Sequence, residues 1–179
     1  MKRMKKLLTG LLTLGMTLSM MTMTAFAAGP TTGTTEKMPT IDFDVNKTGS
    51  ITIHKYEYNG TDGVTGTGAD NQTPPTGAEP LAGVTFKITK IAELNDYYGT
   101  DAKAFPTVEQ AKTMTSIGTP IVQITDENGE AKFNNLSLGL YLVQETDAPA
   151  QITGKVGDFL VSIPMTNADE DDWLYDVHV

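Results

Sequence analysis

The sequence has no cysteine, only two histidines and a single tryptophan. Without cysteine the chain cannot form disulfides, a thiolate zinc site or an iron–sulfur cluster, and it has no thiol nucleophile. The two histidines, His54 and His178, are too few for a histidine-based metal centre. We therefore expect no metal and no cofactor, so any chemistry must come from ordinary side chains.

Basic residues are also scarce, with 13 Lys and Arg against 22 Asp and Glu in 179 residues, for a net charge of −9. Such an acidic chain is repelled by phosphate backbones and by anionic membrane surfaces. We therefore expect neither nucleic acid nor a lipid surface as a partner. The length suits one domain or two small ones.

A long apolar run occurs only at the N-terminus. Met1–Lys6 is basic, Leu7–Met23 is apolar, and Ala25–Ala27 forms a small-x-small cleavage site. This order predicts a secretory signal peptide over residues 1–27 and no membrane insertion once it is removed. Removal takes away four basic residues and no acidic one, so the mature net charge is −9 − 4 = −13.

Composition divides the rest of the chain. Residues 28–49 are rich in Thr, Gly and Pro and are predicted to be a flexible lead-in, which leaves 50–179 as one domain. Within it, 59–80 has almost no apolar residue and is predicted to be a mobile loop. Residues 92–120 interrupt the strand pattern, and Thr107–Gln110 has the sequence of a capping box, so we expect an insertion with a short helix there.

Short alternating segments account for the remainder, and Asn128-Gly129 lies between two of them, which predicts a β-hairpin. Short strands separated by regular turn signals predict an all-β antiparallel sandwich. The predicted strands are 50–57, 83–91, 121–125, 130–133, 138–146, 157–164 and 173–179.

Strand alternation places two charged residues toward the predicted core. Lys55 shares a face with Ile51 and Ile53, and Glu145 shares a face with Tyr141. An apolar environment favours the neutral forms of an amine and a carboxyl group. A neutral amine is a nucleophile, so with a buried carboxamide such a pair can form an amide and release ammonia. Spacing alone favours an ordinary ion pair at the rim of the sandwich.

Several segments together resemble a known family. Ser-Ile-Thr-Ile-His before Lys55, Pro-Leu-Ala-Gly-Val-Thr-Phe-Lys-Ile (80–88) and Gly-Leu-Tyr-Leu-Val-Gln-Glu-Thr-Asp-Ala-Pro-Ala (139–150) are similar to collagen-adhesin B-type domains of Gram-positive surface proteins. Asp-Phe-Leu-Val-Ser-Ile-Pro-Met-Thr-Asn (158–167) and Trp-Leu-Tyr-Asp-Val-His-Val (173–179) resemble the N-terminal domain of SpaA-like, sortase-polymerised major pilins. The resemblance implies an immunoglobulin-like antiparallel β-sandwich.

The resemblance also implies a self-directed reaction. In that family a Lys of the first strand can join an Asn of the last strand through an isopeptide bond, and the acidic residue of a Glu-Thr-x-Ala-Pro motif promotes the reaction. The resemblance assigns the role of the Lys to Lys55 and the role of the acidic residue to Glu145. The family's pilin motif continues with Tyr-Pro-Lys-Asn, whereas this sequence stops after the motif remnant Trp173, Val177 and Val179. We therefore expect a truncated chain whose Asn partner lies beyond Val179, and no bond within the chain as given. The remaining candidates are predicted to lie in loops and to be poor substitutes; they are Asn134, Asn135 and Asn167.

The function implied by the resemblance is that of a structural subunit in a covalently polymerised, cell-wall-attached pilus that supports adhesion. The implied partners are sister pilins, a class C sortase, and host extracellular matrix or other bacteria. The chain is then no enzyme, apart from single-turnover isopeptide formation in the complete protein. The alternative is a surface adhesin or a minor or tip pilin that binds host matrix, although the Trp173–Val179 segment favours the shaft.

Overall fold

The computed structural model describes most of the predicted domain. The predicted signal peptide (1–27) and lead-in residues 28–39 lie outside the described residues. The described residues are 40–42, 44, 46–57, 66–71, 73–98, 101–150, 152, 155–169 and 172–179.

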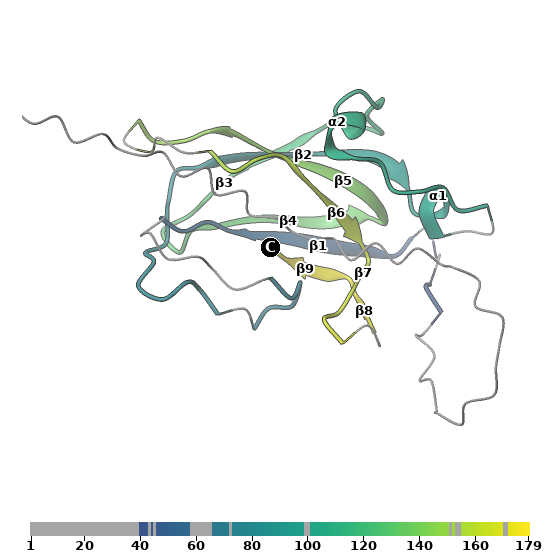
Figure 1. Ribbon diagram of the computed structural model, residues 1–179, viewed down its shortest axis with the longest axis horizontal. Coiled ribbons are helices and arrows are strands. Elements are labelled where there is room, and N and C mark those ends of the chain that lie inside the picture. Colours follow the sequence, from purple (N-terminus) through teal and green to yellow (C-terminus); the bar gives the residue numbers. More distant parts are fainter. Residues whose placement is uncertain are drawn as a thin grey trace, which may run out of the picture.

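Two β-sheets face each other in the described chain (Figure 1). The three-stranded sheet has the order β4-β1-β9, and the four-stranded sheet has the order β3-β2-β5-β6. All pairings are antiparallel except that of β1 with β9, which is parallel. The elements are β1 (Thr48–His54), β2 (Thr85–Glu93), α1 (Asn95–Tyr98), α2 (Val108–Ala111), β3 (Ile121–Ile124), β4 (Glu130–Ser137), β5 (Gly139–Asp147), β6 (Phe159–Ile163), β7 (Met165–Thr166), β8 (Trp173–Leu174) and β9 (Asp176–His178).

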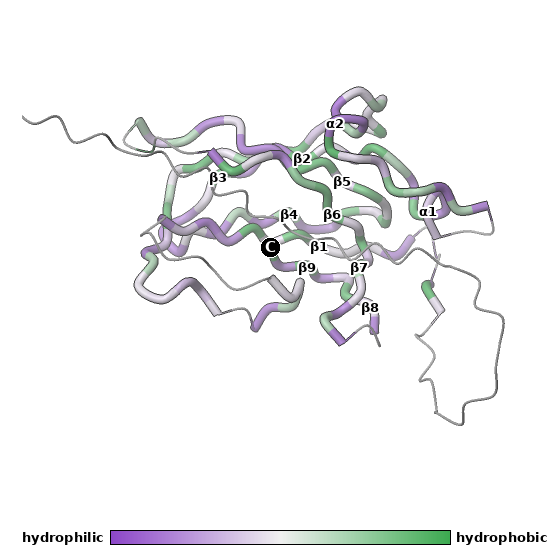
Figure 2. The backbone as a smooth tube through the Cα atoms, in the orientation of Figure 1, coloured by the Kyte–Doolittle hydropathy of each residue, from purple (hydrophilic) through white to green (hydrophobic). Residues whose placement is uncertain are grey.

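Alternation along the strands builds the core between the sheets. Val84, Phe86 and Ile88 are all buried, as the predicted face at the start of β2 requires. Figure 2 shows hydrophobic stretches along β5 and β6 in the four-stranded sheet. β5 is apolar on both faces because Tyr141 and Val143 join the inter-sheet core, whereas its alternate residues join a second cluster.

The short helix predicted within 92–120 covers this second cluster, which contains Ala111, Leu140 and Leu142. The predicted capping box is present: the Gln110 backbone N–H donates to the Thr107 hydroxyl (3.2 Å), and the Thr107 N–H donates to the Gln110 side chain (2.8 Å). The helix thereby covers the outer face of the four-stranded sheet and buries a second layer of apolar side chains.

The hairpin predicted at Asn128-Gly129 is wrong. The turn itself forms, because the Gly129 N–H donates to the carbonyl of Asp126 (2.9 Å). However, β3 pairs with β2 and β4 pairs with β1, so the turn carries the chain from one sheet to the other. The same turn chemistry suits both connections, and the choice is made by side chains that lie far away in the sequence, such as Phe133 of β4 opposite Ile51 of β1.

Other boundaries differ from the sequence-based expectation. The predicted last strand is divided at Tyr175 into β8, which pairs with β7, and β9, which pairs with β1. β1 begins at Thr48, inside the predicted lead-in, and Ile41 is buried in the core. Within the segment predicted to be a mobile loop, Gly68 is held against β9, because the His178 N–H donates to its carbonyl (2.8 Å).

Candidate functional site: a buried lysine–glutamate pair

Lys55 follows the last residue of β1 and is fixed by its backbone. Its N–H donates to the carbonyl of Gly129 (2.8 Å), and its own carbonyl accepts from the N–H of Leu81 (2.9 Å). Gly129 has a positive φ of 73°, and a Cβ at this position would collide with the Lys55 carbonyl oxygen. A glycine is therefore required both by the turn and by the close approach of the two chains.

Glu145 lies in β5 opposite Phe86 of β2. Its side chain is on the same face as Tyr141 and Val143, and it points between the sheets with no exposed surface. The apolar neighbours exclude water from the carboxylate, so its charge must be balanced by protein groups.

The structure brings Lys55 and Glu145 together. The distance between Lys55 Nζ and Glu145 Oε2 is 3.0 Å, and only 11% of the lysine side chain is exposed. Buried, charge-assisted contacts of this kind are strong locally but lose hydration on both groups. Together the two side chains form an amine and a carboxyl group in contact within the apolar interior.

The two carboxylate oxygens of Glu145 differ in their hydrogen bonding. Oε2 accepts both from Lys55 and from the backbone N–H of Val156 (3.1 Å). Oε1 is buried and has no hydrogen-bond partner in the described part of the chain. Because nearly all buried polar atoms in proteins are hydrogen-bonded, this oxygen marks a position where a donor would be stabilised.

The C-terminal part of the pilin-motif remnant lies beside β1, whereas Trp173 lies in β8. Val177 is fully buried and lies opposite Ile51, and Trp173 packs edge-on against Tyr98 with ring centroids 5.5 Å apart. The Val179 N–H donates to Thr52 O (3.0 Å), and Val179 O accepts from the His54 N–H (2.7 Å). The parallel ladder therefore runs through Val179 in the direction of Lys55.

The other asparagines that we considered lie elsewhere. Asn134 and Asn135 belong to β4 and are exposed, so their predicted placement in a loop is wrong. Asn135 has a positive φ of 55°, which accompanies an irregularity in the strand. Asn167 follows β7.

The two histidines, which the sequence indicates only to be too few for a metal centre, are in contact. His54 Nε2 and His178 Nδ1 are 2.9 Å apart, and the rings stack with centroids 5.2 Å apart. Glu130 Oε1 lies 3.6 Å from His54 Nδ1. Burial lowers the pKa of His54, against the opposing effect of Glu130. Only the parallel pairing of β1 with β9 could have revealed this contact.

Among the described residues, no cluster of three or more His, Cys, Asp or Glu side chains is arranged to hold a metal ion. The same residues include no helix that is long and apolar enough to cross a membrane.

The fold and the site define an immunoglobulin-like β-sandwich domain with a buried Lys–Glu pair. Comparison with known proteins gives its family. Residues 46–179 match the family model "Gram-positive pilin subunit D1, N-terminal domain". The chain therefore belongs to this family of Gram-positive pilin N-terminal domains. Proteins of this family are secreted to the cell surface and assemble with other pilins.

Individual relatives agree with this assignment. The chain is 37% identical to the type 1 fimbrial subunit of Actinomyces viscosus, across 78% of this chain and 26% of that protein. Among solved structures it is similar to the major pilin SpaD of Corynebacterium diphtheriae, with 37% identity and a TM-score of 0.59 over 78% of this chain and 32% of that one. The chain is also similar to FimP of Actinomyces oris, with 32% identity and a TM-score of 0.61 over 80% of this chain and 30% of that one. The chain thus spans about a quarter to a third of the length of these relatives.

Proposed function

We propose that this chain is the N-terminal domain of a fimbrial shaft subunit that a class C sortase joins covalently to sister subunits, in a cell-wall-attached pilus that supports adhesion. The observation that carries the proposal is the position of the motif remnant: β9 runs beside β1, and Val179 leaves the ladder close to the buried Lys55–Glu145 pair. A Lys and an Asn that followed in a longer form of the protein would enter this region.

The register supports different roles for those two residues. Ile51 pairs with Val177 and Thr52 with His178, so the second residue after Val179 would lie opposite Lys55 if the parallel ladder continued. Residues at even positions after Val179 would share its core-facing side, and odd ones would face solvent. A Tyr-Pro-Lys-Asn continuation would direct its Lys outward, accessible to sortase, and its Asn inward on the Lys55 side, provided that the proline keeps the alternation.

The chemistry proposed for the pair is amide formation. Transfer of a proton from the Lys55 ammonium to Glu145 within the pair gives a neutral amine and a carboxyl group. The amine attacks the side-chain carbonyl carbon of the Asn, a new C–N bond forms, the bond to the amide nitrogen breaks, and ammonia leaves. The Glu145 carboxyl group donates a proton to the leaving nitrogen and receives one from the lysine nitrogen, so it is regenerated. Oε2 already contacts the amine, and Oε1 is available to accept a hydrogen bond from the amide.

Intact-mass measurement tests the bond in a longer form of the protein that continues through the pilin motif. We expect the mass to fall short of the calculated value by one ammonia. Lys55→Ala and Glu145→Ala should restore the calculated mass, whereas Lys132→Ala, at an exposed surface lysine, should keep the deficit. A wild-type protein of full calculated mass would refute the isopeptide proposal.

Immunoblots of cell-wall extracts test polymerisation separately. We expect a high-molecular-weight ladder in wild-type cells and only the monomer in cells that lack the class C sortase. A ladder in both strains would refute sortase-dependent assembly, whatever the mass measurement shows.

A further inference from the structure

The exposed large hydrophobic residues of the described chain lie in one segment. Ile117, Ile121, Val122 and Ile124 are all of the large hydrophobic residues that are exposed in the described chain, with exposures from 40% to 61%. All four belong to β3 or to the turn before it. We call residues 117–124 the β3 edge.

This segment is also free of charge. From Thr113 to Thr125 the sequence contains no Asp, Glu, Lys or Arg, although the whole chain carries a net charge of −9. Residues 115–124 are exposed without interruption. Natural proteins usually protect an edge strand with charges, a bulge or a covering loop, because its free N–H and C=O groups can pair with another strand. The β3 edge carries no charged residue to serve in this way.

β3 is an edge strand of the four-stranded sheet. It pairs with β2 along one side, from Ile88 with Ile121 to Thr85 with Ile124, and no described strand pairs with its other side. In this register Ile121 shares a face with the buried Ile88, whereas Val122 and Ile124 lie on the outer face of the sheet. A strand added at this side would therefore have apolar neighbours on both of its faces.

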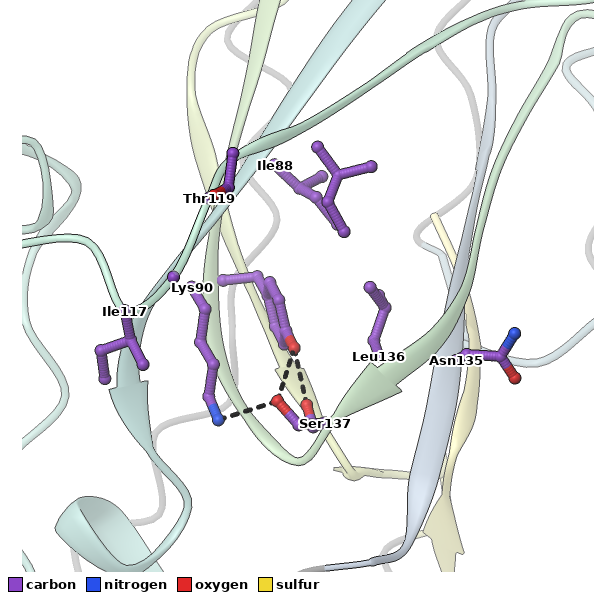
Figure 3. A pocket seen from close by; sticks show the side chains of 10 residues that line it. Ile88, Lys90, Ile117, Thr119, Asn135, Leu136 and Ser137 are labelled. Atoms are coloured by element: carbon purple, nitrogen blue, oxygen red, sulfur yellow. Dashed lines mark hydrogen bonds between the residues drawn. The ribbon is translucent and has the colours of Figure 1, made fainter.

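A cavity of about 250 Å³ opens beside the β3 edge. Figure 3 shows Ile117 and Thr119 on one side of it and Leu136 on the other, with Lys90 donating a hydrogen bond to Ser137. The backbone N–H of Ile117 donates to the carbonyl of Lys90 (2.8 Å), so the turn before β3 is held in place beside the cavity. If a strand were added beside β3, its inward-pointing apolar side chains could fill this cavity.

We propose that the β3 edge is a contact between two copies of this chain, formed by antiparallel pairing of β3 with β3 across a two-fold axis. A second copy is available as the partner, because pilins are cell-surface proteins that assemble with other pilins. A two-fold contact would join such copies side by side and not as successive subunits of one fibre. The charge distribution favours the β3 edge as the place of contact, because two strongly acidic copies repel each other elsewhere on their surfaces. At this uncharged segment they can approach without burying an unpaired carboxylate. The two-fold arrangement places identical apolar residues on both sides and joins the two sheets into one.

Sedimentation velocity over a concentration series tests the pairing on residues 28–179. We expect a reversible dimer. Val122→Lys and Ile124→Lys should each raise the dimer dissociation constant by about tenfold or more, because each places an unpaired charge in the contact. Ala102→Lys is the matched control: it introduces the same charge at an exposed position outside the β3 edge and should leave the dimer intact. Circular dichroism spectra should be the same for all variants.

Cross-linking gives a second readout, because the natural chain has no cysteine to interfere. We compare three single variants, Val122→Cys, Gln123→Cys and Ile124→Cys. Mild oxidation should give a disulfide-linked dimer at the position nearest the two-fold axis, whereas Ala102→Cys should give no disulfide-linked dimer. A chain that is monomeric at every concentration, or a dimer that survives both lysine substitutions, would overturn the proposal. Neither assay requires sortase, so failure here leaves the test of covalent polymerisation unaffected.

Discussion

The region around Lys55 and the β3 edge depart from the usual distribution of side chains in opposite ways. At Lys55 an ion pair is buried in the apolar interior, and at β3 four aliphatic side chains face solvent. Neither arrangement is the one that stability alone would favour, because a buried pair loses hydration and an exposed Ile gains nothing from burial. The comparison teaches that each of these departures from maximal stability coincides with a proposed role, amide formation at Lys55 and contact with a second copy at the β3 edge.

The largest expected effect is the loss of stability when the buried Lys55 is replaced. Lys55→Met should lower the free energy of unfolding by about 3–5 kcal/mol, because it leaves the fully buried Glu145 carboxylate without its cation. Urea denaturation would measure the change. Lys55→Met combined with Glu145→Leu should recover most of the loss, and Lys132→Met at the surface should have a much smaller effect. If Lys55→Met matched the surface control, the pair would not be energetically isolated from water.

Two glycines provide the next comparison, because both have a positive φ but differ in their neighbours. Gly118→Ala, near β3, has nothing within 4 Å of the new Cβ and should cost about 1 kcal/mol from backbone strain alone. Gly129→Ala adds a collision with the Lys55 carbonyl and should cost about 2–3 kcal/mol. Thermal unfolding of the two variants would measure the difference. Equal losses would mean that the turn at Gly129 can move away from Lys55 freely.

A smaller effect is expected from pH at the seam between β1 and β9. The pKa of His54 is lowered, chiefly by burial, with Glu130 opposing and His178 and Lys132 adding to the shift. A histidine whose folded pKa is depressed binds fewer protons when folded than when unfolded. Its stabilising contribution is therefore present above the ordinary pKa of 6.5 and is lost as the pH falls below it.

Denaturation of the wild type between about pH 8 and about pH 5 would measure this loss. His54→Gln should flatten the pH dependence over that interval. An unchanged slope in the variant would show that His54 does not couple folding to proton binding.

The smallest effect is expected at the β3 edge. Ile124→Ala, at a residue that is 61% exposed, should change the free energy of unfolding of the monomer by less than about 0.5 kcal/mol. Ile88→Ala, the same change at a buried residue of the neighbouring strand, should cost about 2–5 kcal/mol. Urea denaturation at high dilution gives both values. A large loss at Ile124 would mean that it already packs within one copy.

Local features of the fold could be predicted from the sequence. Alternation predicts the buried face formed by Val84, just before β2, and by Phe86 and Ile88 within it. The capping box, whose partners are three residues apart, predicts the start of α2. These signals depend only on neighbours along the chain. Alternation likewise placed Lys55 and Glu145 on apolar faces, and the structure adds their 3.0 Å contact.

Pairing partners could not be predicted in the same way. The turn at Asn128-Gly129 has the same local chemistry whether its strands pair with each other or with different sheets. The parallel alignment of β9 with β1 joins residues about 125 positions apart, and the contact of His54 with His178 depends on it. The environment of Glu145 Oε1, which has no hydrogen-bond partner among the described residues, likewise depends on several chain segments that meet in space.

The parallel pairing of β1 with β9 also has a mechanical consequence. A tensile load that enters at Thr48, the first residue of β1, and leaves after β9 pulls the two strands in opposite directions along their length. The hydrogen bonds between them then lie across the load and resist sliding together, whereas a load applied to one end of an antiparallel hairpin opens its bonds one after another. Pulled between these two ends, the seam carries the load in shear.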